Sequence, residues 1–88
     1  MTRSLLVEVV TPEMTVFSGE VESLVVTAPD GEVGVFPLHA PMIARLGEGK
    51  LRLKRADINK TESYTTEGGY LQVAEDKAIV LTDAAVAA

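Results

Sequence analysis

Cysteine is absent from the chain, and histidine occurs once, as His39. Without cysteine there can be neither disulfides nor thiolate metal sites, and a single histidine cannot build a histidine cluster that holds a metal ion. A cysteine–histidine catalytic pair is excluded for the same reason. We therefore expect no metal ion and no cofactor.

Positive charge is also scarce. Eight Lys and Arg residues stand against 13 Asp and Glu residues, which gives a net charge of −5 at pH 7. Nucleic acid and anionic lipid both attract basic surfaces, so we expect neither nucleic-acid binding nor direct lipid insertion. No apolar stretch approaches the length of a membrane span. Residues 1–8 do not read as a signal peptide, because Glu8 interrupts a short apolar run.

Catalytic and phosphate-binding motifs are missing as well. Gly49-Lys50 resembles the end of a phosphate-binding loop, but Ala44 stands where that loop needs a glycine. Leu51 stands where the loop needs serine or threonine. No serine lies in a nucleophile turn of the G-x-S-x-G type. We therefore expect no catalytic residue and no ATP binding.

What the chain does contain is a repeated β pattern. Residues 50–54 alternate strictly, so Leu51 and Leu53 face one side and three basic residues face the other. Short runs of this kind, separated by turn residues at intervals of about 8–12 residues, predict an all-β sandwich or a small barrel. The expected strands are residues 5–10, 15–18, 21–28, 33–36, 42–46, 50–54, 61–66, 70–73 and 78–82, with Gly19 as a break.

The last residues have a different composition. Asp83 can cap a helix and the alanines after it favour one, so residues 83–88 could begin a helix, although one too short to be stable alone. We therefore expect one domain over residues 1–84, followed by a short tail over residues 85–88.

Residues 29–41 are the most distinctive stretch, with three of the four prolines and the single histidine. Asp30-Gly31 predicts a tight turn. Gly34, inside a short β run, predicts a bulge or a close backbone approach, so Gly34→Val should be more harmful than Gly49→Val. The stretch is either a stiff loop on which a partner docks or a plain corner between sheets.

The basic stripe formed by Lys50, Arg52 and Lys54 is likewise either a solvated face or a docking patch. From the residues alone, the fold is a β-sandwich that acts as a binding module and not as an enzyme. A free-standing adaptor that binds a peptide or a sugar stays open at this point, while a small enzyme is disfavoured by the missing motifs.

Four segments, in order along the chain, resemble the N-terminal domain of the F-type ATP synthase epsilon subunit. The most specific of them runs from Gly31 to Pro41. The segments are Val9-Val10-Thr11-Pro12-Glu13, Phe17-Ser18-Gly19, Gly31-Glu32-Val33-Gly34-Val35-Phe36-Pro37-Leu38-His39-Ala40-Pro41, and Glu67-Gly68-Gly69-Tyr70-Leu71-Gln72-Val73.

The resemblance implies a flattened β-sandwich of two roughly five-stranded sheets. It also implies a non-catalytic subunit of the central stalk, which binds the gamma subunit and the polar loops of the membrane c-ring. Such a subunit turns with the rotor and helps couple proton flow to ATP synthesis. It would lie peripherally on the cytoplasmic face of a bacterial inner membrane, or on the equivalent side of an organelle membrane.

The resemblance further implies which residues meet each partner. Typical members continue past the position of Asp83 into two helices that inhibit ATP hydrolysis and, in some members, bind ATP; the sequence ends at Ala88, so neither property is carried over. The residues implied to face the c-ring are Gly31, Glu32, Val33 and Gly34, and those implied to face gamma are Thr11, His39, Met42 and Ala44.

Overall fold

The computed structural model describes residues 4–58 and 60–87, and these form nine strands. No helix able to cross a membrane occurs within these two ranges. Residues 1–3 and 88, which belong to the expected N-terminal segment and tail, lie outside them. The strands are β1 (Leu5–Val10), β2 (Thr15–Ala28), β3 (Gly31–Val35), β4 (Met42–Leu46), β5 (Gly49–Arg55), β6 (Thr61–Thr66), β7 (Gly69–Ala74), β8 (Lys77–Leu81) and β9 (Ala85–Ala87).

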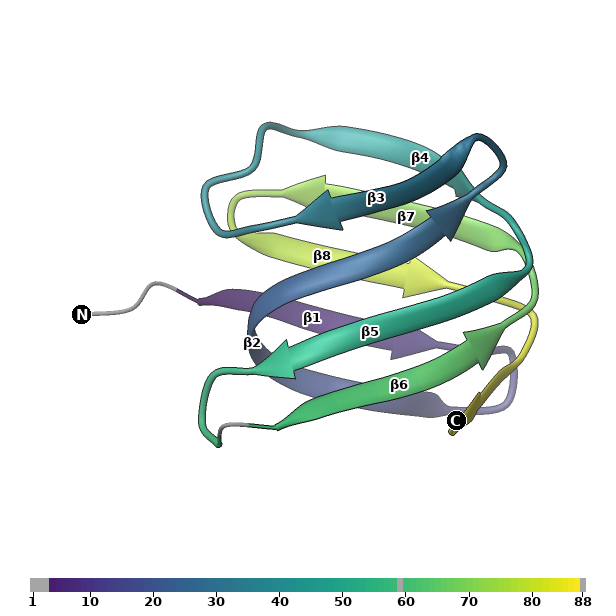
Figure 1. The fold of residues 1–88 in the computed structure, drawn as a ribbon, viewed down its shortest axis with the longest axis horizontal. Helices are drawn as coiled ribbons and strands as arrows, with labels where there is room; N and C mark the ends of the chain where they lie inside the picture. Colours follow the sequence, from purple (N-terminus) through teal and green to yellow (C-terminus); the bar gives the residue numbers. More distant parts are fainter. Residues whose placement is uncertain (1–3, 59, 88) are drawn as a thin grey trace.

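The long strand β2 joins two layers (Figure 1). Its first half pairs with β1, from Thr15 to Val21, and its second half pairs with β3 and β5. The register with β5 shifts between Val21 and Ser23, which is the kind of irregularity that lets a strand pass from one sheet to the other. The break expected at Gly19 is therefore wrong: Gly19 pairs with Val7 inside a continuous strand, and the irregularity follows it.

The pairing order defines the two layers. The β1 layer runs β4-β7-β8-β1 and ends on the first half of β2. The β5 layer runs from β3 through the second half of β2 to β5, β6 and β9. All these pairs are antiparallel except β1 with β8, which is parallel. Counting β2 in both layers gives five strands in each, so the predicted sandwich is confirmed.

The core lies between the layers and follows from period-2 alternation. Leu51 and Leu53 of β5 are buried, as their alternation predicts, while their basic neighbours point to solvent. The fold is stabilised mainly by removing these aliphatic side chains from water. The core residues are Leu5, Val7, Val9, Phe17, Val21, Leu24, Val26, Val35, Leu46, Leu51, Leu53, Tyr64, Leu71, Val73, Ala78 and Val80.

Two glycines behave differently from the sequence prediction. Gly34 pairs with Val25 in regular register, so the expected bulge is wrong. A Cβ at Gly34 would lie 3.3 Å from the exposed Phe36 ring, which can move aside. A Cβ at Gly49 would lie 2.6 Å from Thr27 Oγ1, and that hydroxyl is held by the Lys50 carbonyl. For the fold, Gly49→Val is therefore the more harmful change, and the predicted order is reversed.

The tail is not helical. Ala85–Ala87 forms β9, which pairs with β6 and completes the edge of the β5 layer. Thr82 Oγ1 helps turn the chain there, since it donates to the carbonyl oxygens of Glu67 and Ala84. The helix that this composition allowed does not form, because an open strand edge offers backbone partners that a one-turn helix cannot match.

Candidate partner-binding surfaces

The outer face of the β1 layer, called here the β1 face, carries an unusual amount of apolar surface. Strand register places Arg45, Tyr70, Leu81 and Val10 side by side across β4, β7, β8 and β1. The next row begins with Ile43, whose residue surface is 73% exposed. Other exposed apolar residues on this face are Tyr70, Leu81 and Leu6, at 56%, 49% and 40%. Several exposed apolar side chains on one face are typical of a surface that binds a partner.

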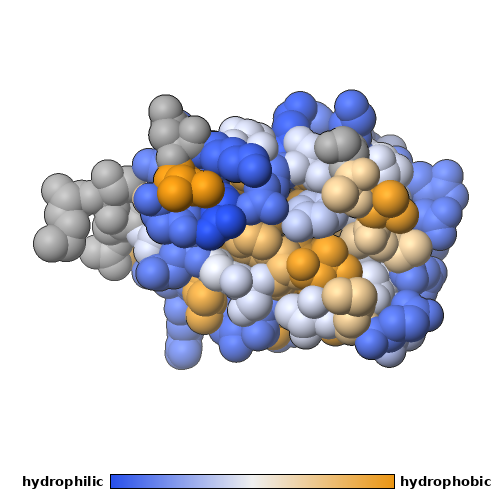
Figure 2. Space-filling model, turned by 90° about the horizontal axis from the view of Figure 1, so that it is seen from below, coloured by the Kyte–Doolittle hydropathy of each residue, from blue (hydrophilic) through white to orange (hydrophobic). Residues whose placement is uncertain are grey.

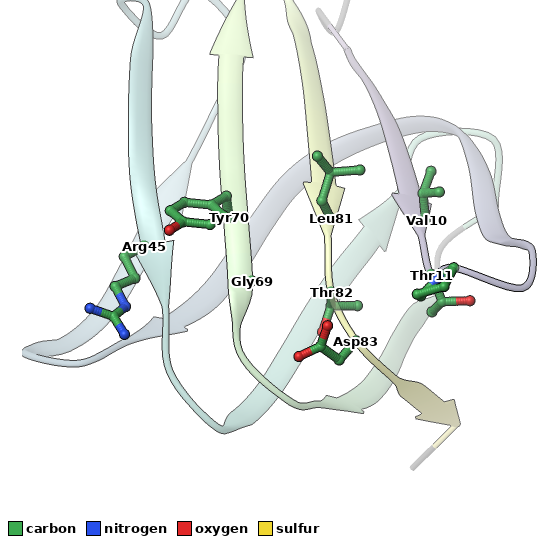
Figure 3. A pocket seen from close by; sticks show the side chains of 9 residues that line it. Val10, Thr11, Arg45, Gly69, Tyr70, Leu81, Thr82 and Asp83 are labelled. Carbon is green, nitrogen blue, oxygen red and sulfur yellow. The ribbon is translucent and has the colours of Figure 1, made fainter.

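One end of the β1 face is hollowed into an open pocket of about 520 Å³. Figure 3 shows the Tyr70 ring and the Arg45 guanidinium next to each other on β7 and β4, with Leu81 and Val10 on the strands beyond. The pocket thus offers an aromatic ring and aliphatic groups together with one basic side chain, Arg45, and one acidic side chain, Asp83. Its lining residues are Val10, Thr11, Pro12, Arg45, Gly69, Tyr70, Leu81, Thr82 and Asp83.

Thr11, predicted to face gamma, lies at this pocket. Its hydroxyl donates to the Met14 carbonyl at 3.2 Å and accepts from the Met14 N–H at 3.3 Å. Its own N–H donates to the same carbonyl at 2.9 Å. These bonds close the turn between β1 and β2, so Thr11 fixes the rim of the pocket.

Met42 and Ala44, also predicted to face gamma, lie on the inner side of β4, where both are half-buried against the core. The outward residues of that strand are Ile43 and Arg45, which sequence reasoning missed. A signal for them was present, because alternation makes the neighbours of two inward residues point outward. In strands β1 and β8, apolar residues occupy outward-facing as well as inward-facing positions, which likewise indicated an apolar outer face.

His39 lies far from Thr11, in the loop between β3 and β4 at the opposite end of the sandwich (Figure 1). Its Nδ1 lies 2.7 Å from the Ala40 carbonyl oxygen. Because a carbonyl only accepts, this contact assigns the ring proton to Nδ1. The four residues predicted to face gamma are thus spread along the length of the β1 layer.

The residues predicted to face the c-ring form strand β3, at the edge of the β5 layer. Glu32 is exposed and accepts from Arg52 Nη2, which lies 3.2 Å from both carboxylate oxygens. Val33 packs partly against the core, whereas Gly31, with φ of 134°, begins the strand after the Pro29-Asp30 turn. Of the predicted set, Glu32 alone offers an exposed charged side chain.

The outer face of the β5 layer, called here the β5 face, is polar along β5, and Val86 is exposed at its β9 edge. Arg52 pairs with Glu32, and Lys54 Nζ lies 3.5 Å from Glu22 Oε2. Two of the three residues in the basic stripe therefore have acidic neighbours. This arrangement favours a solvated face over a basic docking patch.

A second apolar area lies on the side of the molecule seen in Figure 2. Much of the apolar surface there lies toward the middle and right of the view, near the first half of β2 and β9, and the right-hand end is hydrophilic. The large apolar side chains exposed near these strands include Met14 and Val86, at 61% and 65%.

The groups with shifted pKa values belong to one structural network. Arg55 donates to Asp57 at 2.6 and 3.0 Å and to Glu62 at 3.0 Å. The hydrogen bonds from Arg55 lower the pKa of Asp57, and the two acids raise the pKa of Arg55. Burial raises the pKa of the Tyr64 hydroxyl beside Glu62. The network connects the end of β5 to the start of β6, and this structural role explains the pKa shifts without a catalytic role.

In the described parts of the chain, no group of three or more His, Asp and Glu residues could hold a metal ion.

Comparison with known proteins identifies the family. Residues 4–88 match the family described as ATP synthase, Delta/Epsilon chain, beta-sandwich domain. The chain belongs to this family. An ATP synthase epsilon chain of Leptospira borgpetersenii is 39% identical over 77 residues, which cover 88% of this chain and 59% of the relative. An ATP synthase epsilon chain of Chlorobium limicola is 41% identical over 76 residues, which cover 86% and 85%.

This chain thus spans about 60% of the Leptospira epsilon chain but most of the Chlorobium one. Epsilon chains are parts of an enzyme complex, and membership of this family favours the ATP synthase interpretation over a free-standing adaptor.

A chain of the Euglena gracilis mitochondrial ATP synthase, in a structure that contains F1 and the c-ring, matches the fold with a TM-score of 0.87. The match covers 96% of this chain and 53% of the other at 21% identity, so it supports the fold alone.

Proposed function

We propose that this chain is a non-catalytic rotor component of the central stalk of an F-type proton-translocating ATP synthase. In this role it binds the gamma subunit and the polar loops of the c-ring, and so helps couple proton flow to ATP synthesis. It lies peripherally at the membrane, on the side that carries the catalytic head.

The contrast between the two outer faces supports this proposal most directly. The β1 face exposes Ile43, Tyr70 and Leu81, whereas the β5 face is polar along β5, where Arg52 and Lys54 have acidic partners. Stable interfaces bury an apolar centre, while charged rims set association rate and register. The β1 face therefore suits a lasting contact with gamma.

Strand β3 suits the other contact. It is an edge strand, and its charged residue Glu32 projects from the layer opposite the β1 face. A carboxylate there can meet basic groups on the polar loops of the c-ring, in a contact that salt would screen. Two separate surfaces of different chemistry are what a connector between two rotor parts requires.

Replacing Glu32 with lysine tests the c-ring contact. Its ion pair with Arg52 is about half exposed, so we expect the charge reversal to cost about 1 kcal/mol of folding stability or less. We expect the same change to lower proton-driven ATP synthesis, because a positive charge would repel basic groups on the c-ring. The measurement is ATP synthesis in membranes reconstituted with the mutant chain, beside a thermal melt of that chain.

Glu22→Lys is the matched control. It makes the same charge reversal at a second, partly exposed ion pair of the β5 layer, the pair with Lys54. Normal coupling in Glu22→Lys and impaired coupling in Glu32→Lys would support the c-ring contact. Equal coupling in the two variants, or a large fall in Tm for Glu32→Lys, would overturn it.

A further inference from the structure

Leu38 holds a backbone conformation that leucine rarely adopts. The His39 N–H donates to the Phe36 carbonyl at 3.2 Å, so residues 36–39 form a β-turn. Proline occupies its second position, and Leu38, with φ of 67°, occupies its third. This is the pattern of a type II turn, whose third position favours glycine because other side chains are strained there.

The Leu38 side chain gains nothing from the fold in return. It is 66% exposed, and Phe36 on the other side of Pro37 is 58% exposed. A large apolar side chain is therefore held in water on a strained backbone. Strain of this kind persists where the surrounding structure enforces it and is typical of ligand clamps and binding sites.

Asp76 is the residue that enforces the turn. Its carboxylate Oδ1 accepts the Leu38 N–H at 2.6 Å, and its backbone carbonyl accepts the Leu6 N–H at 3.0 Å. Glu75 and Asp76 connect β7 to β8 with positive φ at both residues, which is the two-residue hairpin turn of type I′. The turn that presents Leu38 is thus fixed to the strands that carry Tyr70 and Leu81.

We propose that Leu38 is an affinity-determining anchor that inserts into an apolar pocket on the gamma subunit, with Asp76 as its positioning residue. The inference rests on the proposed function, because gamma is taken as the partner of the β1 face. The loop from Leu38 leads directly into β4, whose Ile43 belongs to that face. Because this loop continues into the β1 face, gamma, and not the c-ring, is the partner that receives the Leu38 side chain.

Leu38→Asn tests the anchor. Asparagine tolerates positive φ and keeps the N–H that Asp76 accepts, but it removes the apolar side chain. We expect binding to gamma, co-expressed with the chain and then purified, to weaken at least about tenfold, as loss of an interface anchor does. We expect Tm to stay the same or rise, since strain is relieved. Leu38→Met should retain the affinity, and Ile58→Asn, which removes another exposed apolar residue in a different loop, should not change it.

The outcomes separate this inference from the proposed function. Failure of the unmodified chain to bind gamma would overturn the proposed function and the anchor with it. Binding by the unmodified chain and equal binding by Leu38→Asn would overturn the anchor alone. A fall in Tm that accounts for weaker binding would show a structural role and also overturn it. Self-association that Leu38→Asn abolishes, with gamma binding intact, would assign the residue to a second copy of the chain instead.

Discussion

Gly69→Ala is expected to destabilise the fold strongly, although it adds only one methyl group. Gly69 has φ of 109°, and a Cβ there would collide with the Leu81 carbonyl on the neighbouring strand β8. Neither backbone can retreat easily, because β7 lies between β4 and β8. Backbone strain and overpacking together should cost about 3 kcal/mol or more. For a domain of this size, that lowers Tm by about 12–24 °C.

Gly31→Ala is the matched control for that prediction. Gly31 also has a positive φ, of 134°, but no atom lies within 4 Å of the position of its missing Cβ. The control therefore measures the conformational cost without the collision. Thermal melts of the two variants decide the matter, and a fall in Tm for Gly69→Ala no larger than that for Gly31→Ala would contradict the explanation.

Leu81→Glu is expected to cause the largest loss of partner binding. Leu81 lies between Tyr70 and Val10 on the β1 face and lines the pocket at its end. A carboxylate there would have to be buried without a partner against gamma. We expect gamma binding to weaken about 100-fold, which corresponds to about 2.7 kcal/mol. Because the side chain is 49% exposed in the free chain, Tm should change little.

Thr65→Glu provides the comparison on the other side of the molecule. Thr65 is exposed on β6, in the β5 layer, so the same new charge is placed away from the β1 face. Binding measured by calorimetry should be unaffected in this variant. If Leu81→Glu binds gamma as well as Thr65→Glu does, the β1 face is not the gamma surface.

Alternation allowed most strands to be predicted from sequence. In a two-layer fold, Leu51 and Leu53 must face the core because their neighbours on the strand are basic. The turn residues on either side indicated where β5 begins and ends. Local patterns failed where long-range pairing decided the outcome. Glycine at position 19 suggested a break, but Gly19 pairs with Val7 of β1 inside the continuous strand β2. The alanines of the tail favoured a helix, but they pair with the open edge of β6 instead.

The candidate surfaces were less predictable than the fold. Glu32 was implied by the resemblance to face the c-ring, yet its ion pair with Arg52 depends on β2 bringing β3 and β5 together. The β1 face escaped notice because its residues come from four strands and only the register brings them side by side. The conformation of Leu38 was equally hidden, since a leucine in the third position of that turn gives no sequence signal for positive φ.

The absence of cysteine makes the central claim directly measurable, because each introduced thiol is unique in the chain. Single variants Leu81→Cys, Glu32→Cys and Thr65→Cys would be labelled with a photoactivated crosslinker and incorporated into the assembled ATP synthase. We expect position 81 to crosslink to gamma, position 32 to crosslink to the c-ring and position 65 to crosslink to neither. Crosslinking of positions 81 and 32 to neither partner, or to the same one, would contradict the central claim.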